Sequence, residues 1–335
     1  MSISVQERYF SWNRILLLAV GLWPYHQSRF ARFQAALCLS ILTSFVVFVL
    51  SRLYFTEYSF EFTIHLLSIS MYYTFFVINH IAFWINIETA RNLLEQFQYI
   101  YKRLKDAKEI AIYNKYGNFA NRITLSCIIH NIGTVGILAT GTMLLSCLKH
   151  ISGILRIASY RFEHAITATL QSITIKNETM NYKEFIYAVD IHRKAMECAK
   201  FGVDGMERSF FVITMITVLC MSLNLYGIFQ VESPMQEIEK TAGHFFNIMC
   251  LFIYMFLGNY AGQEITDCNN HIFLTIYNAP WYLAPLQIQK VILFLLQRSN
   301  KAFTLNIGGI FTLSIESFTS LVNASLSYLT LMLSV

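Results

Sequence analysis

Apolar residues along this chain are concentrated in six segments that are long enough to cross, or nearly cross, a lipid bilayer. These segments are 30–53, 62–85, 119–147, 210–231, 245–261 and 306–335. About 20 consecutive apolar residues span the hydrocarbon core of a bilayer as a helix. The stretches between them are more polar and keep helical spacing, as at Leu93, Leu94 and Phe97. The pattern therefore predicts an all-α, polytopic membrane helical bundle with six apolar segments.

The last segment, 306–335, is apolar enough to span a bilayer yet carries a line of polar residues. At about 100° per residue, one narrow stripe of a helix would hold these side chains. They are Glu316, Ser320, Asn323, Ser327, Thr330 and Ser334. Facing lipid they would be costly, whereas facing a water-filled path they would cost little. Hydrogen bonding between packed helices explains the same stripe equally well, so the pattern leaves both interpretations open.

Composition supports the membrane assignment and excludes several functions. The chain is 55% hydrophobic and 13% charged, too apolar for a soluble globular domain. The net charge of +5 is spread over the loops, so nothing indicates a nucleic-acid partner. The seven cysteines have no metal-binding spacing, and we expect buried thiols. With no paired intramembrane carboxylates and no nucleotide-binding loop, we expect neither an enzyme nor any metal or cofactor.

Lysine and arginine counts predict the orientation of the chain but also reveal a conflict. The loop at 54–61 contains neither residue, and the loop at 232–241 contains only Lys240, so both should lie outside the cell. The N-terminus should then be cytoplasmic. The regions on both sides of segment 119–147 are strongly basic, however, and one span cannot begin and end on the same side. Either this segment is a re-entrant hairpin, or a span and an outer loop are missing.

The apolar pattern and the charge count, together with the motif resemblance described in the next paragraph, divide the chain into six regions; the resemblance implies the fused third and fourth segment and the pore-lining role of the last helix. They are a cytoplasmic N-terminal lead-in at 1–29; membrane helices one and two with a fused third and fourth segment at 30–148; a cytoplasmic helical region at 149–208; membrane helices five and six at 209–262; a cytoplasmic anchor block at 263–305; and a pore-lining last helix at 306–335.

Several short motifs resemble those of insect odorant receptors. Near the C-terminus they are Gly262-Gln263-Glu264, Tyr277-Asn278-Ala279-Pro280-Trp281-Tyr282, Gln297-Arg298-Ser299, Gly308-Gly309-Ile310-Phe311 and Ser325-Leu326-Ser327-Tyr328. Nearer the N-terminus they are Phe10-Ser11-Trp12-Asn13, Gly21-Leu22-Trp23-Pro24 and Tyr160-Arg161-Phe162-Glu163-His164.

The resemblance implies a seven-span receptor with a cytoplasmic N-terminus in the plasma membrane of olfactory sensory neurons. Such a receptor would bind a small volatile odorant and assemble with a shared co-receptor, as a heterotetramer, into a ligand-gated cation channel. Two alternatives are a receptor of the G-protein-coupled type and a non-functional, shortened receptor product.

The chain departs from the family pattern where the charge count fails. Residues 86–122 resemble the connection between the second and third helices, while 136–161 resemble the inner half of the fourth. Most of the third span, the second outer loop and the start of the fourth helix are therefore expected to be absent. We expect the fused segment to re-enter or to stay on the cytoplasmic side, leaving the ligand cavity short of a wall.

The resemblance also predicts site residues. The ligand would contact helices two and five in an apolar, aromatic pocket in the outer half of the bundle, although such stripes commonly serve core packing. The candidates are Phe62, His65, Ile69, Tyr72, Tyr73, Phe76, Leu223, Tyr226 and Gln230. In the last helix the resemblance places a hydrophobic narrowing near Leu331 and Val335 with Tyr328 below it, whereas the polar stripe favours Ser327, Thr330 and Ser334 as pore residues.

Overall fold

The computed structural model describes residues 5–55, 60–104, 106–130, 135–171, 178–230, 238–299 and 303–334. Its elements begin with α1 (Val5–Tyr9), α2 (Ser11–Ala19), α3 (Arg29–Phe55), α4 (Phe60–Ile85), α5 (Ile87–Lys102), α6 (Ala107–His130) and α7 (Val135–Gln171). They continue with α8 (Glu178–Phe229), α9 (Ile238–Asn278), the short 3-10 helix η2 (Trp281–Leu283), α10 (Leu286–Ser299), β1 (Asn306–Ile307), β2 (Phe311–Thr312) and α11 (Ile315–Ser334).

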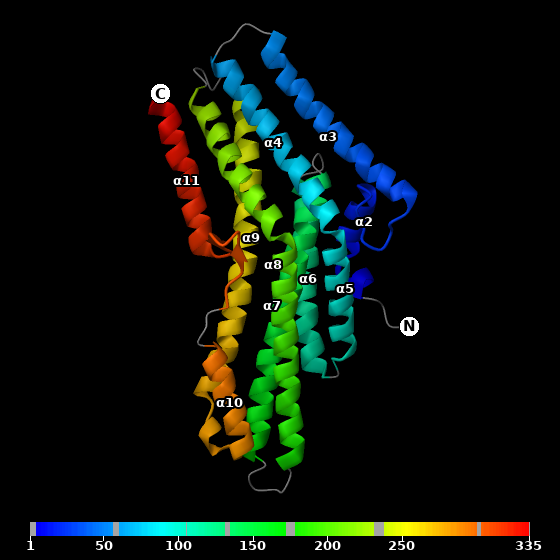
Figure 1. Cartoon of the computed structure of the whole chain (residues 1–335), viewed down its shortest axis with the longest axis vertical. Helices are drawn as coiled ribbons and strands as arrows, with labels where there is room; N and C mark the ends of the chain where they lie inside the picture. Colours follow the sequence, from blue (N-terminus) through cyan, green and yellow to red (C-terminus); the bar gives the residue numbers. More distant parts are fainter. Residues whose placement is uncertain are drawn as a thin grey trace.

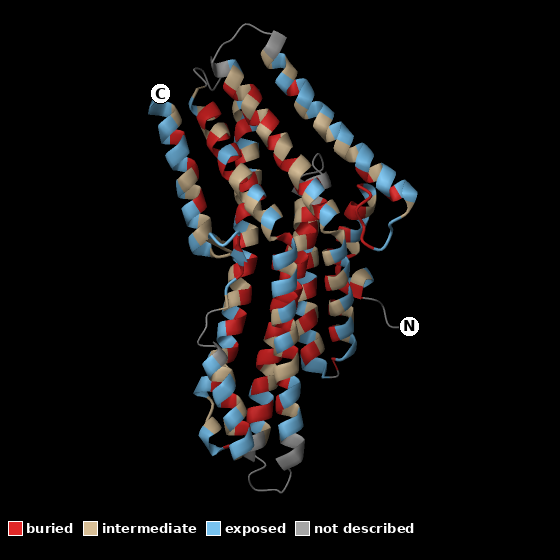
Figure 2. Ribbon diagram, viewed as in Figure 1, coloured by how far each residue is buried: buried red, intermediate tan, exposed pale blue. Residues whose placement is uncertain are grey.

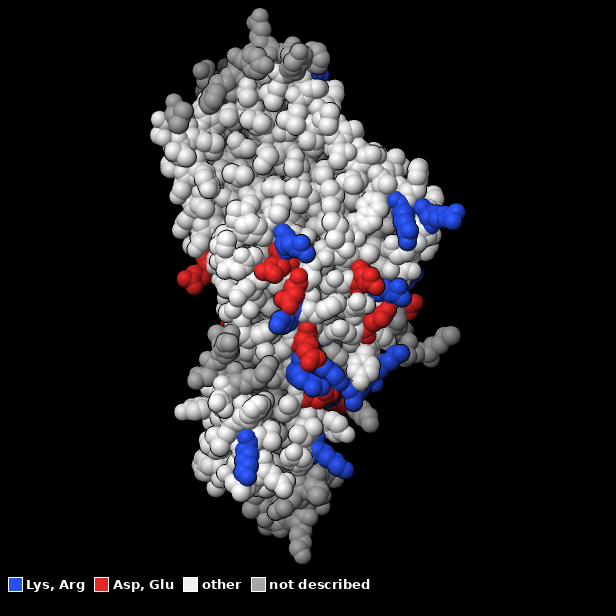
Figure 3. All heavy atoms as spheres, in the orientation of Figure 1, with Lys and Arg blue, Asp and Glu red and all other residues white. Residues whose placement is uncertain are grey.

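The molecule is an elongated helical bundle with a charge-poor half and a charged half (Figures 1 and 3). The charge-poor half, at the top of the figures, contains α3, α4, α11 and the adjoining ends of α8 and α9. On the visible face, the Lys, Arg, Asp and Glu side chains lie over the middle and lower parts of the molecule, and the upper part is almost free of them. Because ionised side chains are costly inside a bilayer, the charge-poor half is the part suited to the membrane.

Four helices among the described residues are long and apolar enough to span a bilayer. These spans are Arg29–Leu53, Phe62–Ile85, Tyr182–Phe229 and Ile238–Asn278. At 1.5 Å per residue the 52 residues of α8 extend about 78 Å, more than twice the thickness of a hydrocarbon core. The expected boundaries at 148/149, 208/209 and 262/263 therefore fall inside the continuous helices α7, α8 and α9.

The first span, α3, packs mainly against α4 and leaves most of its surface uncovered. Only 11% of its most apolar window is buried (Figure 2). Its outward side chains include Phe30, Phe33 and Phe48. Such a surface is stable only against lipid or another protein.

The fused segment is a helical hairpin. It consists of α6 and α7, which pack side by side, and the end of α6 and the beginning of α7 lie beside α4 in the charge-poor half (Figure 1). The antiparallel packing of α6 and α7 is compatible with the re-entrant interpretation. The side of the membrane on which each loop lies stays a prediction from the charge count.

Asn13 of α2 ties this hairpin to the N-terminal segment. The Asn13 side chain is fully buried. Its Nδ2 donates to Thr142 Oγ1 at 3.1 Å, and its Oδ1 accepts from Ser146 Oγ at 3.3 Å and from Thr124 Oγ1 at 3.4 Å. The expected lead-in helix is thus two short helices, and they are part of the core.

The last helix begins later than the sequence predicts. Residues 306–312 form a two-stranded antiparallel hairpin in which Asn306 pairs with Thr312 and Ile307 with Phe311. The turn residues Gly308 and Gly309 have φ angles of 61° and 68°. Two consecutive positive φ angles are typical of the type I′ turn, which glycine accommodates without steric cost. The expectation of a helix from Asn306 is therefore wrong, and α11 starts at Ile315.

Candidate functional site

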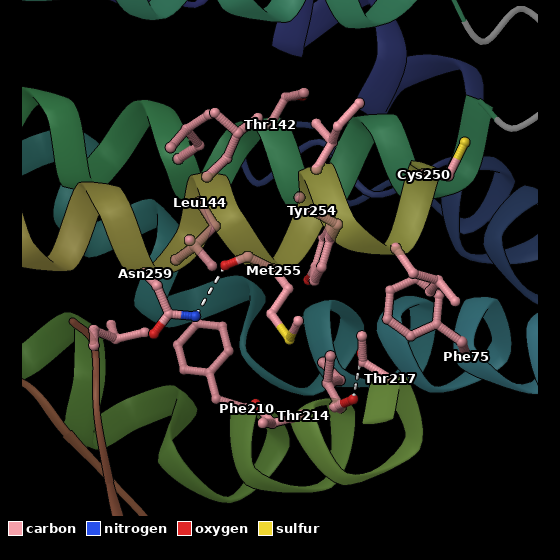
Figure 4. Close-up of a pocket in the computed structure, with 18 of the residues that line it drawn as sticks. Phe75, Thr142, Leu144, Phe210, Thr214, Thr217, Cys250, Tyr254, Met255 and Asn259 are labelled. Atoms are coloured by element: carbon pink, nitrogen blue, oxygen red, sulfur yellow. Dashed lines mark hydrogen bonds between the residues drawn. The ribbon is translucent and has the colours of Figure 1, made fainter. Parts of the chain in front are cut away.

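A cavity of about 160 Å³ lies where α4, the α6–α7 hairpin, α8 and α9 meet. Its walls are predominantly apolar (Figure 4). The lining residues used below are Tyr72, Phe76, Cys127, Gly141, Thr142, Phe210, Thr214, Thr217, Tyr254, Asn259, Ile307 and Leu313. An apolar protein cavity of about 150 Å³ can hold a molecule the size of benzene.

Most of the polar groups in the wall already have partners. Thr217 Oγ1 donates to the Ile213 carbonyl at 2.7 Å, and Tyr254 OH donates to Asn79 Oδ1 at 3.0 Å. Asn259 Nδ2 donates to the Met255 carbonyl at 2.9 Å, as the dashed line in Figure 4 shows. A guest molecule would therefore be selected chiefly by shape and by contacts with aromatic rings.

The α6–α7 hairpin supplies a wall that the sequence led us to expect missing. Cys127 of α6 and the stretch from Gly141 to Leu148 of α7 border the cavity. A Cβ atom on Gly141 would lie 2.8 Å from the Tyr254 ring, so the absence of a side chain lets α7 approach α9 closely. The hairpin thus supplies one side of this cavity, which lies nearer the middle of the bundle than the outer pocket that the resemblance predicts; that outer pocket stays a prediction.

Two of the nine predicted ligand residues, Tyr72 and Phe76, line this cavity. Their rings are 4.6 Å apart and edge-to-face. The other seven, Phe62, His65, Ile69, Tyr73, Leu223, Tyr226 and Gln230, are not among its lining residues. Phe62 is exposed, Ile69 and Leu223 are partly buried, and the Tyr73 ring packs 4.2 Å from Phe45 of α3.

Three of those seven, His65, Tyr226 and Gln230, form contacts near the ends of α4 and α8 that lie farthest from the charged half. His65 Nδ1 lies 3.1 Å from His244 Nε2 of α9, and His244 Nδ1 lies 3.0 Å from Asn224 Oδ1 of α8. Tyr226 is buried between α4 and α11, and Gln230 Nε2 donates to its hydroxyl at 2.5 Å. The structure therefore places His65, Tyr226 and Gln230 in contacts between or along helices.

The lining residues that sequence reasoning missed come from α6, α7, α9, the β1–β2 segment and the part of α8 that contains Phe210, Thr214 and Thr217. Ile307 and Leu313 were assigned to the last helix, whereas they lie in β1 and just after β2. The positions of Cys127 and Gly141 at the cavity depend on the antiparallel packing of α6 and α7. Only the glycine at 141 gave a signal, since small residues allow close helix approach in membranes.

The polar stripe of α11 points away from the rest of the chain. The opposite face, with Leu321, Ser325 and Leu329, is buried against α8 and α9. Glu316, Ser320, Asn323, Ser327, Thr330 and Ser334 are all exposed, as are Tyr328 and Leu331; Val335 lies outside the described residues. The hydroxyls of Ser320, Ser327, Thr330 and Ser334 donate to backbone carbonyls of α11 itself. Among the residues that the structure describes, therefore, the stripe does not join α11 to another helix.

Within the described ranges, no group of three or more His, Cys, Asp or Glu side chains is arranged to hold a metal ion.

Comparison with known proteins assigns this architecture. The family model described as 7tm Odorant receptor matches residues 55–326. Odorant receptor 10 of Aedes albopictus is 28% identical over 115 residues, which are 34% of this chain and 29% of that relative's length. The matched part thus spans less than a third of the relative.

Two solved structures share the fold of this chain. The insect olfactory receptor OR5 from Machilis hrabei matches with a TM-score of 0.78 and 14% identity, over 98% of both chains. The same receptor in complex with eugenol matches with a TM-score of 0.73 and 13% identity, again over 98% of both chains. At this level of identity the likeness establishes the fold.

Proposed function

The chain belongs to the 7tm Odorant receptor family, and on this premise we propose that it is an odorant receptor subunit that binds a small volatile molecule in the α4–α7–α8–α9 cavity. The observation that carries the proposal is the cavity itself: it is apolar, about 160 Å³ in volume, and lies within the charge-poor half. This size suits a single-ring compound. The related Machilis receptor has been solved with eugenol, a compound of that kind.

The test is binding to the purified chain in detergent, with benzaldehyde and eugenol as probes. A molecule that binds only the folded state stabilises it by about 1.4 kcal/mol at ten times its dissociation constant. We expect both probes to raise the unfolding temperature. Thr214→Phe, which fills the cavity from α8, should remove most of this effect.

Leu219→Phe is the matched control. Leu219 is on the same helix, is 44% exposed and does not border the cavity. It should leave the probe-induced stabilisation unchanged. A stabilisation equally strong in Thr214→Phe, or absent from the unaltered chain, would contradict the proposed site.

We further propose that the chain acts as part of a ligand-gated cation channel formed with an odorant receptor co-receptor. The exposed polar stripe of α11 supports this, because such a face is suited to a water-filled path shared between subunits. The proposal places the N-terminus in the cytoplasm and the assembly in the plasma membrane of olfactory sensory neurons.

An apolar surface on the charged half supports assembly. It consists of exposed side chains from the end of α9, η2 and α10, namely Leu274, Tyr277, Tyr282, Leu283, Leu286, Leu293 and Phe294. In the charged half this surface has no lipid to cover it, so a partner subunit is its natural occupant. The other side of α10, with Ile288 and Ile292, is already buried within the chain.

Co-purification with the co-receptor tests the assembly. Leu293→Glu should reduce recovery of the complex several-fold, because it places a charge within an apolar interface. Gln297→Glu adds the same charge at an exposed polar position one turn further along α10 and should not reduce recovery. Equal recovery of the two variants would argue against this surface as the contact.

A further inference from the structure

The cavity and the start of α11 share residues. Ile307 of β1 and Leu313, which follows β2, both line the cavity. Leu313 N donates to the Leu305 carbonyl at 2.9 Å, which continues the β1–β2 pairing toward α11. The part of the cavity wall formed by Ile307 and Leu313 therefore belongs to the segment that leads directly into α11.

This segment is packed closely against α8 and α9. A Cβ atom on Gly308 would lie 2.7 Å from the Phe211 ring of α8, and Phe211 follows the cavity residue Phe210. A Cβ atom on Gly262 of α9 would lie 2.1 Å from Leu313 Cβ and 2.8 Å from the Leu313 carbonyl oxygen. The β1–β2 hairpin thus has little room to move independently of the cavity walls.

The side chain of Asn259, on α9, connects the cavity to the start of α11. It is 6% exposed and lines the cavity. Its Nδ2 donates to Met255 within α9, while its Oδ1 accepts from the backbone N–H of Ser314 at 3.3 Å.

Ser314 is the residue that caps α11. Its Oγ accepts from the backbone N–H of Ser317 at 3.1 Å, and its carbonyl accepts from Phe318 N at 3.0 Å. Serine at this position satisfies a donor that the first turn would otherwise leave unpaired. The Asn259 amide therefore holds Ser314, the residue that caps the helix, at the edge of the cavity.

We propose that Asn259 is a positioning residue that couples occupancy of the cavity to the placement of α11. A single-ring guest in contact with Asn259, Ile307 or Leu313 would change how these groups pack and shift the start of α11 through the Asn259–Ser314 hydrogen bond. A ligand shifts a conformational equilibrium only by its difference in affinity for the two states, and these shared residues are where that difference arises. This inference rests on the proposed function and adds the route from cavity to helix.

The experiment uses the full chain assembled with the co-receptor in membranes and carrying Ser320→Cys on the exposed stripe of α11. Two quantities are measured with and without benzaldehyde: the unfolding temperature, and the rate at which a small thiol reagent modifies residue 320, quantified by mass spectrometry of that peptide. With Asn259 present, benzaldehyde should change the rate about fivefold or more. In Asn259→Leu the rate should no longer respond, whereas benzaldehyde should still raise the unfolding temperature.

Two further variants separate coupling from damage to the helix start. Asn259→Asp keeps an oxygen acceptor for Ser314 N–H, next to the positive end of the α11 dipole, and should restore the response. Ser314→Ala removes the capping hydroxyl but keeps the Asn259 hydrogen bond, so its modification rate should also respond to benzaldehyde.

An Asn259→Leu variant whose modification rate responds as strongly as that of the unaltered chain would overturn the coupling. If benzaldehyde fails to stabilise even the unaltered chain, the proposed function fails and the coupling fails with it; stabilisation without any rate change overturns the coupling alone.

Discussion

Lys149 shows how a single side chain can join two parts of the bundle. Its side chain is 1% exposed, and its Nζ lies 2.6 Å from Glu264 Oε2. The ammonium group also lies 4.8 Å from the ring centre of Phe119 and 4.6 Å from that of Tyr260. The ion pair thereby fixes α7 to α9 below the cavity. A buried charge of this kind is tolerated because it is paired and because the two rings face it.

Glu264→Gln should destabilise the folded chain by about 2–3 kcal/mol, because Lys149 would remain buried without its counter-charge. This value is below the usual range for buried pairs, since Glu264 is 23% exposed. Glu95→Gln is the control: it breaks the Arg91–Glu95 pair, whose side chains are 54% and 53% exposed, and should cost less than about 0.5 kcal/mol. The free energies of unfolding of Glu264→Gln and Glu95→Gln are measured in detergent. Equal decreases in the two variants would contradict a stabilising role for the buried pair.

His150 is a buried histidine without a hydrogen-bond partner on either ring nitrogen among the described residues. It lies in the charged half of α7, stacked 4.8 Å from Phe10 and 5.5 Å from Phe97. Tyr9 and Tyr113 pack edge-on or tilted against the same ring. Burial lowers the pKa of His150 from 6.5 to about 3, because the charged imidazolium would lose its hydration.

The stability of the chain should therefore fall in mild acid. The unfolded chain binds a proton at His150 below pH 6.5, whereas the folded chain does not until about pH 3, so stability is lost as the pH falls through this window. Between pH 7 and pH 5 the contribution is about 2 kcal/mol. In His150→Phe, unfolding measured at both pH values should show a smaller loss by about this amount. An unchanged difference between the two pH values would contradict the assignment.

The sequence alone did not predict which partners individual buried side chains such as Lys149 have. Lys149 was counted with the loop charges, because its partner Glu264 lies 115 positions later and only the α7–α9 packing brings them together. Glycine patterns are more informative, since a pair of consecutive glycines such as Gly308-Gly309 is by itself typical of a turn.

The β1–β2 hairpin and α9 form the element pair on which the start of α11 depends. Apolar content alone favoured a continuous helix from Asn306, since Ile307, Ile310 and Phe311 are hydrophobic. A β-hairpin forms there instead of a helix, because the consecutive glycines favour a turn and because Leu313 packs closely against Gly262. The glycine pair is a local signal for the turn, while the close approach to α9 is tertiary and could not be predicted.

Gly262→Ala should destabilise the chain by about 1–3 kcal/mol, because its Cβ would overlap Leu313 and push the hairpin away from α9. Gly243→Ala is the control on the same helix, where a Cβ atom meets nothing within 4 Å. That change should be neutral or stabilise by up to about 1 kcal/mol, because alanine favours helix. Thermal unfolding of the two purified variants compares them, and a harmless Gly262→Ala would mean that the close contact is not required.

For the whole molecule, apolar periodicity predicted the membrane bundle, and the charge count located the one irregular segment. The sequence could not predict how the shortened segment folds. The α6–α7 hairpin lies where an outer wall was expected to be absent, and it brings Cys127 and Gly141 to the cavity. For this reason the cavity lies deeper than residues such as His65 suggested, with only Tyr72 and Phe76 shared between prediction and structure.

We propose that a cavity bordered by this hairpin serves an odour-gated receptor. Whole-cell current in cells that express the chain with the odorant receptor co-receptor, recorded during application of benzaldehyde or eugenol, tests this proposal. We predict an evoked cation current from the unaltered chain and from Leu219→Phe. In the cavity-filling Thr214→Phe, the concentration that gives half-maximal current should be at least about tenfold higher. This shift corresponds to about 1.4 kcal/mol or more of lost binding free energy. No current from the unaltered chain, or indistinguishable responses from the two variants, would contradict the claim.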